Sequence, residues 1–146
     1  MEDEYNLQRF IDAQSLWYNT ALNEINKGRK RSHWIWFIFP QILGLGRSTN
    51  SIKYALKSKE EAILYLNHPI LGSNLIEITK AFLTLENKSA YEILGSTDSK
   101  KLKSCMTLFD FIQSENNIFQ DVILKYFNGN KCIDTLNLLK EQLHLD

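Results

Sequence analysis

Residues 6–28 have the sequence NLQRFIDAQSLWYNTALNEINKG, and this segment establishes the fold class. Its apolar side chains recur three or four positions apart, which is the spacing of one face of an α-helix. The face consists of Leu7, Phe10, Ile11, Gln14, Trp17, Tyr18, Ala21, Leu22 and Ile25. Gln14 is the polar member, so it needs a hydrogen-bonding partner if it is buried. Gly28 ends the pattern, because glycine readily adopts the left-handed conformation that closes helices.

Helical spacing continues through the rest of the chain. Ser58, followed three residues later by Glu61, has the spacing of a capping box and predicts a helix that begins near Lys59. His68-Pro69 predicts the start of another helix, since proline is tolerated in a first helical turn. Gly95-Ser96 marks the end of one helix and the beginning of the next.

Turns in the second half of the chain also separate segments with helical spacing. The polar turn at residues 114–117 and Gly129 separate further helical segments, the last of which covers 133–143. Only the run Trp34–Phe39 is ambiguous between a core helix and a buried strand. The sequence predicts an all-α fold with about six to eight helices.

Length and composition indicate one domain over residues 1–146. The chain is 44% hydrophobic and 23% charged, which is typical of a globular protein. Its acidic N-terminus lacks the apolar core of a signal peptide, and its longest apolar run is far shorter than the roughly 20 residues of a membrane span. The two cysteines cannot form a disulfide framework. We expect a soluble, cytoplasmic protein.

Charge is distributed unevenly along the chain. Seventeen Lys and Arg residues balance seventeen Asp and Glu residues, which argues against nonspecific nucleic-acid binding. Residues 25–59, however, contain eight of the cations and no acidic residue, and the remainder of the chain is net acidic. The cations are Lys27, Arg29, Lys30, Arg31, Arg47, Lys53, Lys57 and Lys59. Such a local excess can attract an anion although the net charge is zero.

The basic segment GRKRSHWIWFIFPQILGLGRS, residues 28–48, combines cations, aromatic rings and closely spaced glycines. This combination suits a nucleotide or another phosphorylated ligand, because guanidinium groups bind phosphate and aromatic faces stack on bases. We expect phosphate contacts from Lys30, Arg31 and Arg47, and ring packing from Trp34 or Trp36. Further polar contacts are expected from His33, Gln41, Ser48 and Tyr54.

The predicted function is therefore the binding of an anionic small molecule at residues 28–54. If the protein is an enzyme, His33 is the candidate acid–base catalyst for hydrolysis or group transfer, since neighbouring cations favour a neutral imidazole. The alternative is a non-catalytic interaction module that binds an acidic protein partner with the same surface. Other interpretations remain open: the aromatic residues can be chiefly core, and the cations can form a solvated turn or contact an anionic membrane.

No other motif indicates chemistry. The three histidines are too scattered for a helical metal pair, so the sequence predicts neither a metal site nor a cofactor. His68 is interpreted as a helix-entry residue. Cys105 and Cys132 are interpreted as small core residues, because neither has the flanking His or cation cluster of a nucleophile.

Four segments carry a resemblance to a known family: NLQRFIDAQ at 6–14, the basic segment at 28–48, LNHPILGSNL at 66–75 and MTLF at 106–109. They resemble the domain-of-unknown-function 1810 family of small bacterial proteins over nearly the whole chain. The resemblance implies a compact all-α fold and no particular reaction. Some members carry the label calpastatin, but calpastatin-type inhibitors are disordered, whereas this composition is globular.

The resemblance can be carried over residue by residue. The matching positions are Arg9, Gln14, Lys30, Ser32, His33, Trp34, Trp36, Phe37, Pro40, Gln41, Gly44, Gly46, Ser48, Tyr54, His68, Pro69 and Gly72. The chain departs from the family after Gly95-Ser96, where it has Thr97-Asp98 in place of the frequent Pro-Asp. This departure lies at a predicted helix start, and we expect it to leave any site unaffected.

Overall fold

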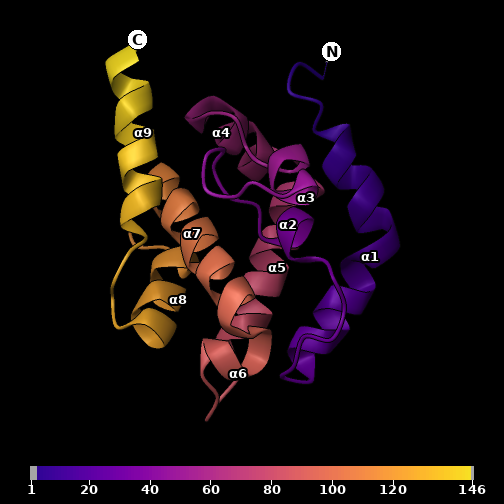
Figure 1. Cartoon of the computed structure of the whole chain (residues 1–146). Helices are drawn as coiled ribbons and strands as arrows, with labels where there is room; N and C mark the ends of the chain where they lie inside the picture. Colours follow the sequence, from indigo (N-terminus) through magenta and orange to yellow (C-terminus); the bar gives the residue numbers. More distant parts are fainter. Residues whose placement is uncertain (1–2, 146) are drawn as a thin grey trace.

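Helix α7 (Ser96–Gln113) lies at the centre of the structure and contacts α2, α4, α6, α8 and α9 (Figure 1). The computed structural model describes residues 3–145, with side chains up to Gln142. Within this range it has nine helices, six of them at least seven residues long, and no strand. The others are α1 (Gln8–Asn26), α2 (Ile35–Ile38), α3 (Thr49–Lys53), α4 (Lys59–Asn67), α5 (Leu71–Leu83), α6 (Ala90–Leu94), α8 (Ile118–Phe127) and α9 (Ile133–Leu145). The all-α prediction is confirmed.

Buried aromatic rings connect the helices through the core. Phe10 of α1 meets Tyr65 of α4 edge-on, with ring centroids 5.0 Å apart. Tyr65 then packs on Phe109 of α7 at 5.8 Å, and Phe109 on Phe119 of α8 at 5.6 Å. All four rings are almost completely buried. Because large rings contribute most of the apolar area that folding removes from water, this row ties α1, α4, α7 and α8 into one core.

The predicted end of the first helix at Gly28 and the predicted start of a helix at Lys59 are correct, although the predicted capping box is not. Gly28 has a φ of +80° just beyond α1, and α4 begins at Lys59 after the Ser58 hydroxyl, which accepts the backbone N–H of Glu61. The Glu61 carboxylate does not return to the backbone of Ser58. It accepts the backbone N–H of Lys57 and pairs with Arg9 instead.

The ambiguous run Trp34–Phe39 contains the short helix α2. The chain then bends back, and Ile42 forms an isolated parallel bridge with Leu56. The aromatic residues of the run are mainly core, since Trp34, Phe37 and Phe39 are all buried. Trp17, predicted on the buried face of α1, is instead 40% exposed at the edge of that face.

The polar side chain predicted on the buried face of α1 has the partners it requires. The Gln14 amide donates to the backbone carbonyl of Phe37 and to the hydroxyl of Tyr65, at 2.8 and 2.9 Å. Its oxygen accepts the side-chain amide of Asn74 at 2.9 Å. Because every partner comes from a different helix or loop, this residue fixes the mutual positions of α1, α2, α4 and α5.

His68 also has the structural role predicted for it. Its Nδ1 accepts the backbone N–H groups of Ile70 and Leu71 at the start of α5. No helix within residues 3–145 is long and apolar enough to span a bilayer.

Gly72 allows the closest approach between α5 and the preceding chain. A Cβ atom at this position would lie 1.9 Å from the backbone carbonyl oxygen of Leu66. We expect Gly72→Ala to lower the free energy of unfolding by about 3 kcal/mol, because backbone must move to relieve the overlap. Chemical denaturation measures the change, and Ser73→Ala, at an exposed position on the same helix, is the control. Equal stability of the two variants would contradict this interpretation.

Candidate functional site

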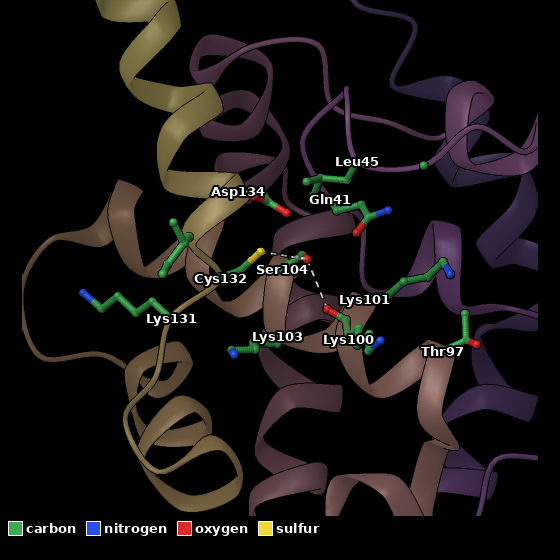
Figure 2. A pocket seen from close by; sticks show the side chains of 12 residues that line it. Gln41, Leu45, Thr97, Lys100, Lys101, Lys103, Ser104, Lys131, Cys132 and Asp134 are labelled. Carbon is green, nitrogen blue, oxygen red and sulfur yellow. Dashed lines mark hydrogen bonds between the residues drawn. The ribbon is translucent and has the colours of Figure 1, made fainter.

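A pocket of about 530 Å³ opens between the loop after α2, one face of α7 and the beginning of α9 (Figure 2). Its volume is within the range of small-molecule sites, about 300–1,000 Å³. We call it the lysine pocket. It is lined by Gln41, Leu45 and Gly46 from the loop, by Thr97, Lys100, Lys101, Lys103 and Ser104 from α7, and by Lys131, Cys132, Ile133 and Asp134 at α9.

The lining of the lysine pocket carries an excess of positive charge. Four lysines stand against one carboxylate, that of Asp134. Lys131 is neutralised in part, because its Nζ lies 3.0 Å from the buried carboxylate of Asp110. Lys100, Lys101 and Lys103 form no ion pair with any described side chain. The pocket therefore favours an anion.

Gln41 projects into the lysine pocket from a rigid part of the loop (Figure 2). Its backbone carbonyl accepts the N–H of Leu56 at 2.9 Å, and the N–H of Leu43 returns to the carbonyl of Leu56 at 2.8 Å. The residue is only 9% exposed, and its side-chain amide forms no hydrogen bond within the described chain. The amide is not among the fully buried unpaired groups, so it faces the open space of the pocket and is free to bind a ligand.

The loop is held against its neighbours through two glycines. Gly44 has a φ of +113°, and a Cβ atom there would lie 3.1 Å from the side chain of Leu138 in α9. At Gly46 a Cβ atom would lie 2.5 Å from the hydroxyl of Ser51 in α3. The spaced glycines therefore serve close packing and a special backbone conformation, which together place the loop at the pocket.

Cys132 lies immediately before α9 and takes the place of a capping residue. Its carbonyl accepts the N–H of Leu136, and its own N–H donates to the hydroxyl of Thr107 at 2.9 Å. The Ser104 hydroxyl lies 3.4 Å from Sγ and 3.1 Å from the carbonyl oxygen of Lys100, and these two acceptors share its proton (Figure 2). The Thr135 hydroxyl, in the first turn of α9, is buried and has no hydrogen-bond partner in the described chain.

These contacts distinguish the two cysteines chemically. Burial and the carboxylate of Asp134 act to raise the pKa of the Cys132 thiol, but the polar groups of Ser104 and Thr135 near the sulfur outweigh them and lower the pKa below its usual value. Cys105 is completely buried, and burial raises the pKa of its thiol well above the usual value. Cys105 is the core residue that the sequence predicts, whereas Cys132 is half-buried in the lysine pocket, so the prediction for Cys132 is wrong.

The basic segment is organised by the buried carboxylate of Glu24 in α1. Glu24 Oε1 accepts the backbone N–H groups of Arg31 and Ser32 and the indole Nε1–H of Trp34, at 2.8 to 3.0 Å. Its Oε2 accepts the Ser32 hydroxyl at 2.6 Å. Burial by itself would raise the pKa of Glu24, but these hydrogen bonds lower it to about 2. A carboxylate from outside the segment therefore fixes the conformation of residues 31–34.

Two residues predicted to contact the ligand make contacts inside the protein instead. Trp34 is completely buried, so its ring has no face open to a ligand. The Lys30 side chain is only 8% exposed, forms an ion pair with Asp98 at 2.8 Å and lies over the Trp34 ring. Its charge is therefore neutralised inside the protein, which weighs against the predicted phosphate contact of Lys30.

The remaining predicted residues do not meet around one cavity. Arg31 and His33 are exposed, and Trp36 is half-buried against the core. Arg47 is exposed and is not part of the pocket lining. The Ser48 hydroxyl caps α3 by accepting the N–H of Ser51. Of the predicted residues, Gln41 alone lines the lysine pocket.

Tyr54 lies apart from Gln41. Its ring packs on Phe10 and Phe37, and it lines a second pocket together with Arg9. Among the described side chains, no group of three His, Cys, Asp or Glu residues is arranged to hold a metal ion.

Comparisons with known proteins agree with this architecture. A family model described as "Protein of unknown function (DUF1810)" matches residues 4–139. The chain belongs to this family. The crystal structure of the conserved hypothetical protein Rv1873 from Mycobacterium tuberculosis superimposes on this DUF1810 protein with a TM-score of 0.92. The two chains are 40% identical, over 94% of this chain and 99% of that one. A comparison with curated proteins gives no match.

Residues 97–98, where this DUF1810 protein has Thr-Asp in place of the family's frequent Pro-Asp, lie closer to the pocket than the sequence suggests. Thr97 lines the lysine pocket, and Asp98 is the partner of Lys30. The helix start thus borders the candidate pocket, and the expectation that the departure leaves any site unaffected stays a prediction. A signal for the pocket was present in the sequence, because three lysines fall between residues 100 and 103 and Lys131 directly precedes Cys132. Their convergence depends on the packing of α7 against α9.

Lowering the pH should remove the stabilisation that the ionised Glu24 carboxylate gives to the folded form of this DUF1810 protein. Because its folded pKa of about 2 lies below the ordinary value of 4.5, its contribution to stability is complete above about pH 4.5 and is lost as the pH falls toward 2. We expect Glu24→Gln to lower the free energy of unfolding by about 2 kcal/mol at neutral pH, since charge-assisted hydrogen bonds are replaced by weaker ones.

Denaturant titrations across this pH range measure the effect. The difference between wild type and Glu24→Gln should shrink as the pH approaches 2. Asp12→Asn removes an exposed carboxylate from the same helix and is the control. A difference that stays constant with pH would contradict the assigned role of Glu24.

Proposed function

We propose that this DUF1810 protein binds an anionic small molecule, a nucleotide or a derivative of one, in the lysine pocket. The observation that carries the proposal is the coincidence of unpaired cations with an unpartnered amide. Lys100, Lys101 and Lys103 supply positive charge without internal counterions among the described residues, and the Gln41 amide faces the same space. Lysines suit phosphate or carboxylate groups, and a glutamine amide suits a group that both donates and accepts hydrogen bonds.

The basic segment supplies loop residues to the lysine pocket, but none of its cations. Gln41, Leu45 and Gly46 line the pocket, while the α7 lysines come from the part of the chain that is net acidic. The ligand class inferred from the sequence is retained. Its position moves from residues 28–54 to the junction of the loop, α7 and α9.

Thermal-shift measurements against nucleotides, dinucleotides, ADP-ribose and sugar phosphates test the proposal. A ligand at about a hundredfold excess over its dissociation constant should stabilise the folded protein by about 2.7 kcal/mol. Lys101→Gln should weaken its binding about tenfold, because one charge-assisted contact is lost. Lys80→Gln, on an exposed face of α5, is the matched control.

Two further variants locate the site. His33→Ala and Arg47→Ala should leave the affinity unchanged if the ligand occupies the lysine pocket. Loss of the shift in these variants, with Lys101→Gln unaffected, would return the site to the basic segment. No shift with any compound would contradict the proposal.

Exposed cations of the basic segment support a second candidate, an interaction surface for an acidic protein partner. Arg29, Arg31 and Arg47 are exposed and form no ion pair with a described side chain. Charges of this kind raise association rates with an acidic surface and make binding sensitive to salt. Retention of a partner on the immobilised wild type, with loss in an Arg29→Ala and Arg31→Ala double variant, would favour this candidate.

A further inference from the structure

Cys132 presents its sulfur to the lysine pocket under conditions that favour nucleophilic chemistry. Its backbone is fixed on both sides, through Thr107 and Leu136, so the sulfur has a defined position. The positive end of the thirteen-residue helix α9 lies directly beside it. The Ser104 hydroxyl lies 3.4 Å from Sγ and can donate to the thiolate, which is the reactive form of cysteine.

Gln41 provides an independent indication that a ligand binds in the same pocket as this sulfur. The residue is 9% exposed, lines the pocket, and its side-chain amide has no hydrogen-bond partner in the described part of the chain (Figure 2). An amide N–H in this position can donate to an oxygen that becomes negatively charged during a reaction. Lys100 and Lys101, also in the lining, can hold the ligand's anionic group.

We propose that Cys132 is a nucleophile that adds to the carbonyl carbon of a small anionic ligand held in the lysine pocket. The inference rests on the proposed function, because the pocket must first bind the anion. In the step, the thiol first loses its proton to water, Sγ then forms a bond to the carbonyl carbon, and the π electrons of the carbonyl group move to its oxygen. The oxygen accepts a hydrogen bond from Gln41 Nε2 and takes a proton from water. The product is a thiohemiacetal-type adduct, whose formation requires no oxidant, reductant or leaving group.

Alkylation with iodoacetate and iodoacetamide tests both parts of the inference. In each reaction the sulfur forms a bond to the CH₂ carbon, the C–I bond breaks and iodide leaves. The two reagents differ in charge, since iodoacetate is an anion and iodoacetamide is neutral. The rate at each cysteine is measured by peptide mass spectrometry and compared with the rates of N-acetylcysteine under the same conditions.

We expect Cys132 to react at least about tenfold faster than Cys105 with either reagent, because Cys105 is buried and its thiol is held protonated. The ratio of iodoacetate to iodoacetamide rates at Cys132 should exceed that of N-acetylcysteine several-fold. The Lys100→Gln and Lys101→Gln double variant should reduce this ratio to the N-acetylcysteine value and leave the iodoacetamide rate nearly unchanged. Lys80→Gln should alter neither rate.

Ser104→Ala separates activation of the sulfur from attraction of the reagent. It should slow both reagents equally, because it removes a donor to the sulfur and leaves the lysines in place. A thermal melt of each variant establishes that it is folded.

The possible failures are distinguishable. Reaction of Cys132 no faster than N-acetylcysteine with both reagents would overturn the nucleophile and leave ligand binding to be judged by the thermal shifts. A second outcome is that Cys132 reacts fast but the lysine double variant has the same ratio of iodoacetate to iodoacetamide rates as the wild type. This outcome would contradict anion binding by the pocket lysines and, with it, the proposed function.

Discussion

The Arg9 guanidinium is enclosed by groups from three parts of the chain. It pairs with the completely buried carboxylate of Glu61 at 2.8 Å and donates to the backbone carbonyls of Lys53 and Ala55. A buried carboxylate is tolerable only if it is paired, so α1 and α4 must hold the 53–55 segment between them. The next residue, Leu56, is the backbone partner of Gln41. The position of the one predicted ligand-binding residue in the lysine pocket therefore depends on this ion pair.

A second buried carboxylate explains why the basic segment is not itself the pocket. Glu24 gathers the backbone of residues 31 and 32 and the indole of Trp34, while Asp98 neutralises Lys30. Lys30 and the buried aromatic rings, which resemble a phosphate site in the sequence, are thus used inside the fold. The unpaired cations that line the lysine pocket belong to α7, in the net acidic remainder of the chain. The contribution of a charge depends on its partners, and partners distant in sequence are set by tertiary packing.

Some features were predictable because their causes are local. A glycine with positive φ ends α1, a serine hydroxyl caps α4, and His68 accepts the first N–H groups of α5. The interior position of Gln14 followed from its place on a helical face. The capping box at Ser58 was wrong because Glu61 has a stronger partner in Arg9, more than fifty residues away. Cys132 was misassigned for a similar reason, since its hydrogen-bond partners Ser104 and Thr107 lie on another helix.

The amino-acid sequence by itself determined the all-α class, most helix boundaries and the membership of the DUF1810 family, because periodicity, caps and motifs depend on neighbouring residues. It also determined that Gln41 belongs to a glycine-spaced loop. Only the tertiary structure decided which charges remain unpaired, which tryptophan is buried and that Lys100, Lys101 and Cys132 line one pocket. Side chains become buried or paired when helices distant in sequence pack together, and the spacing of residues along the chain does not predict those contacts.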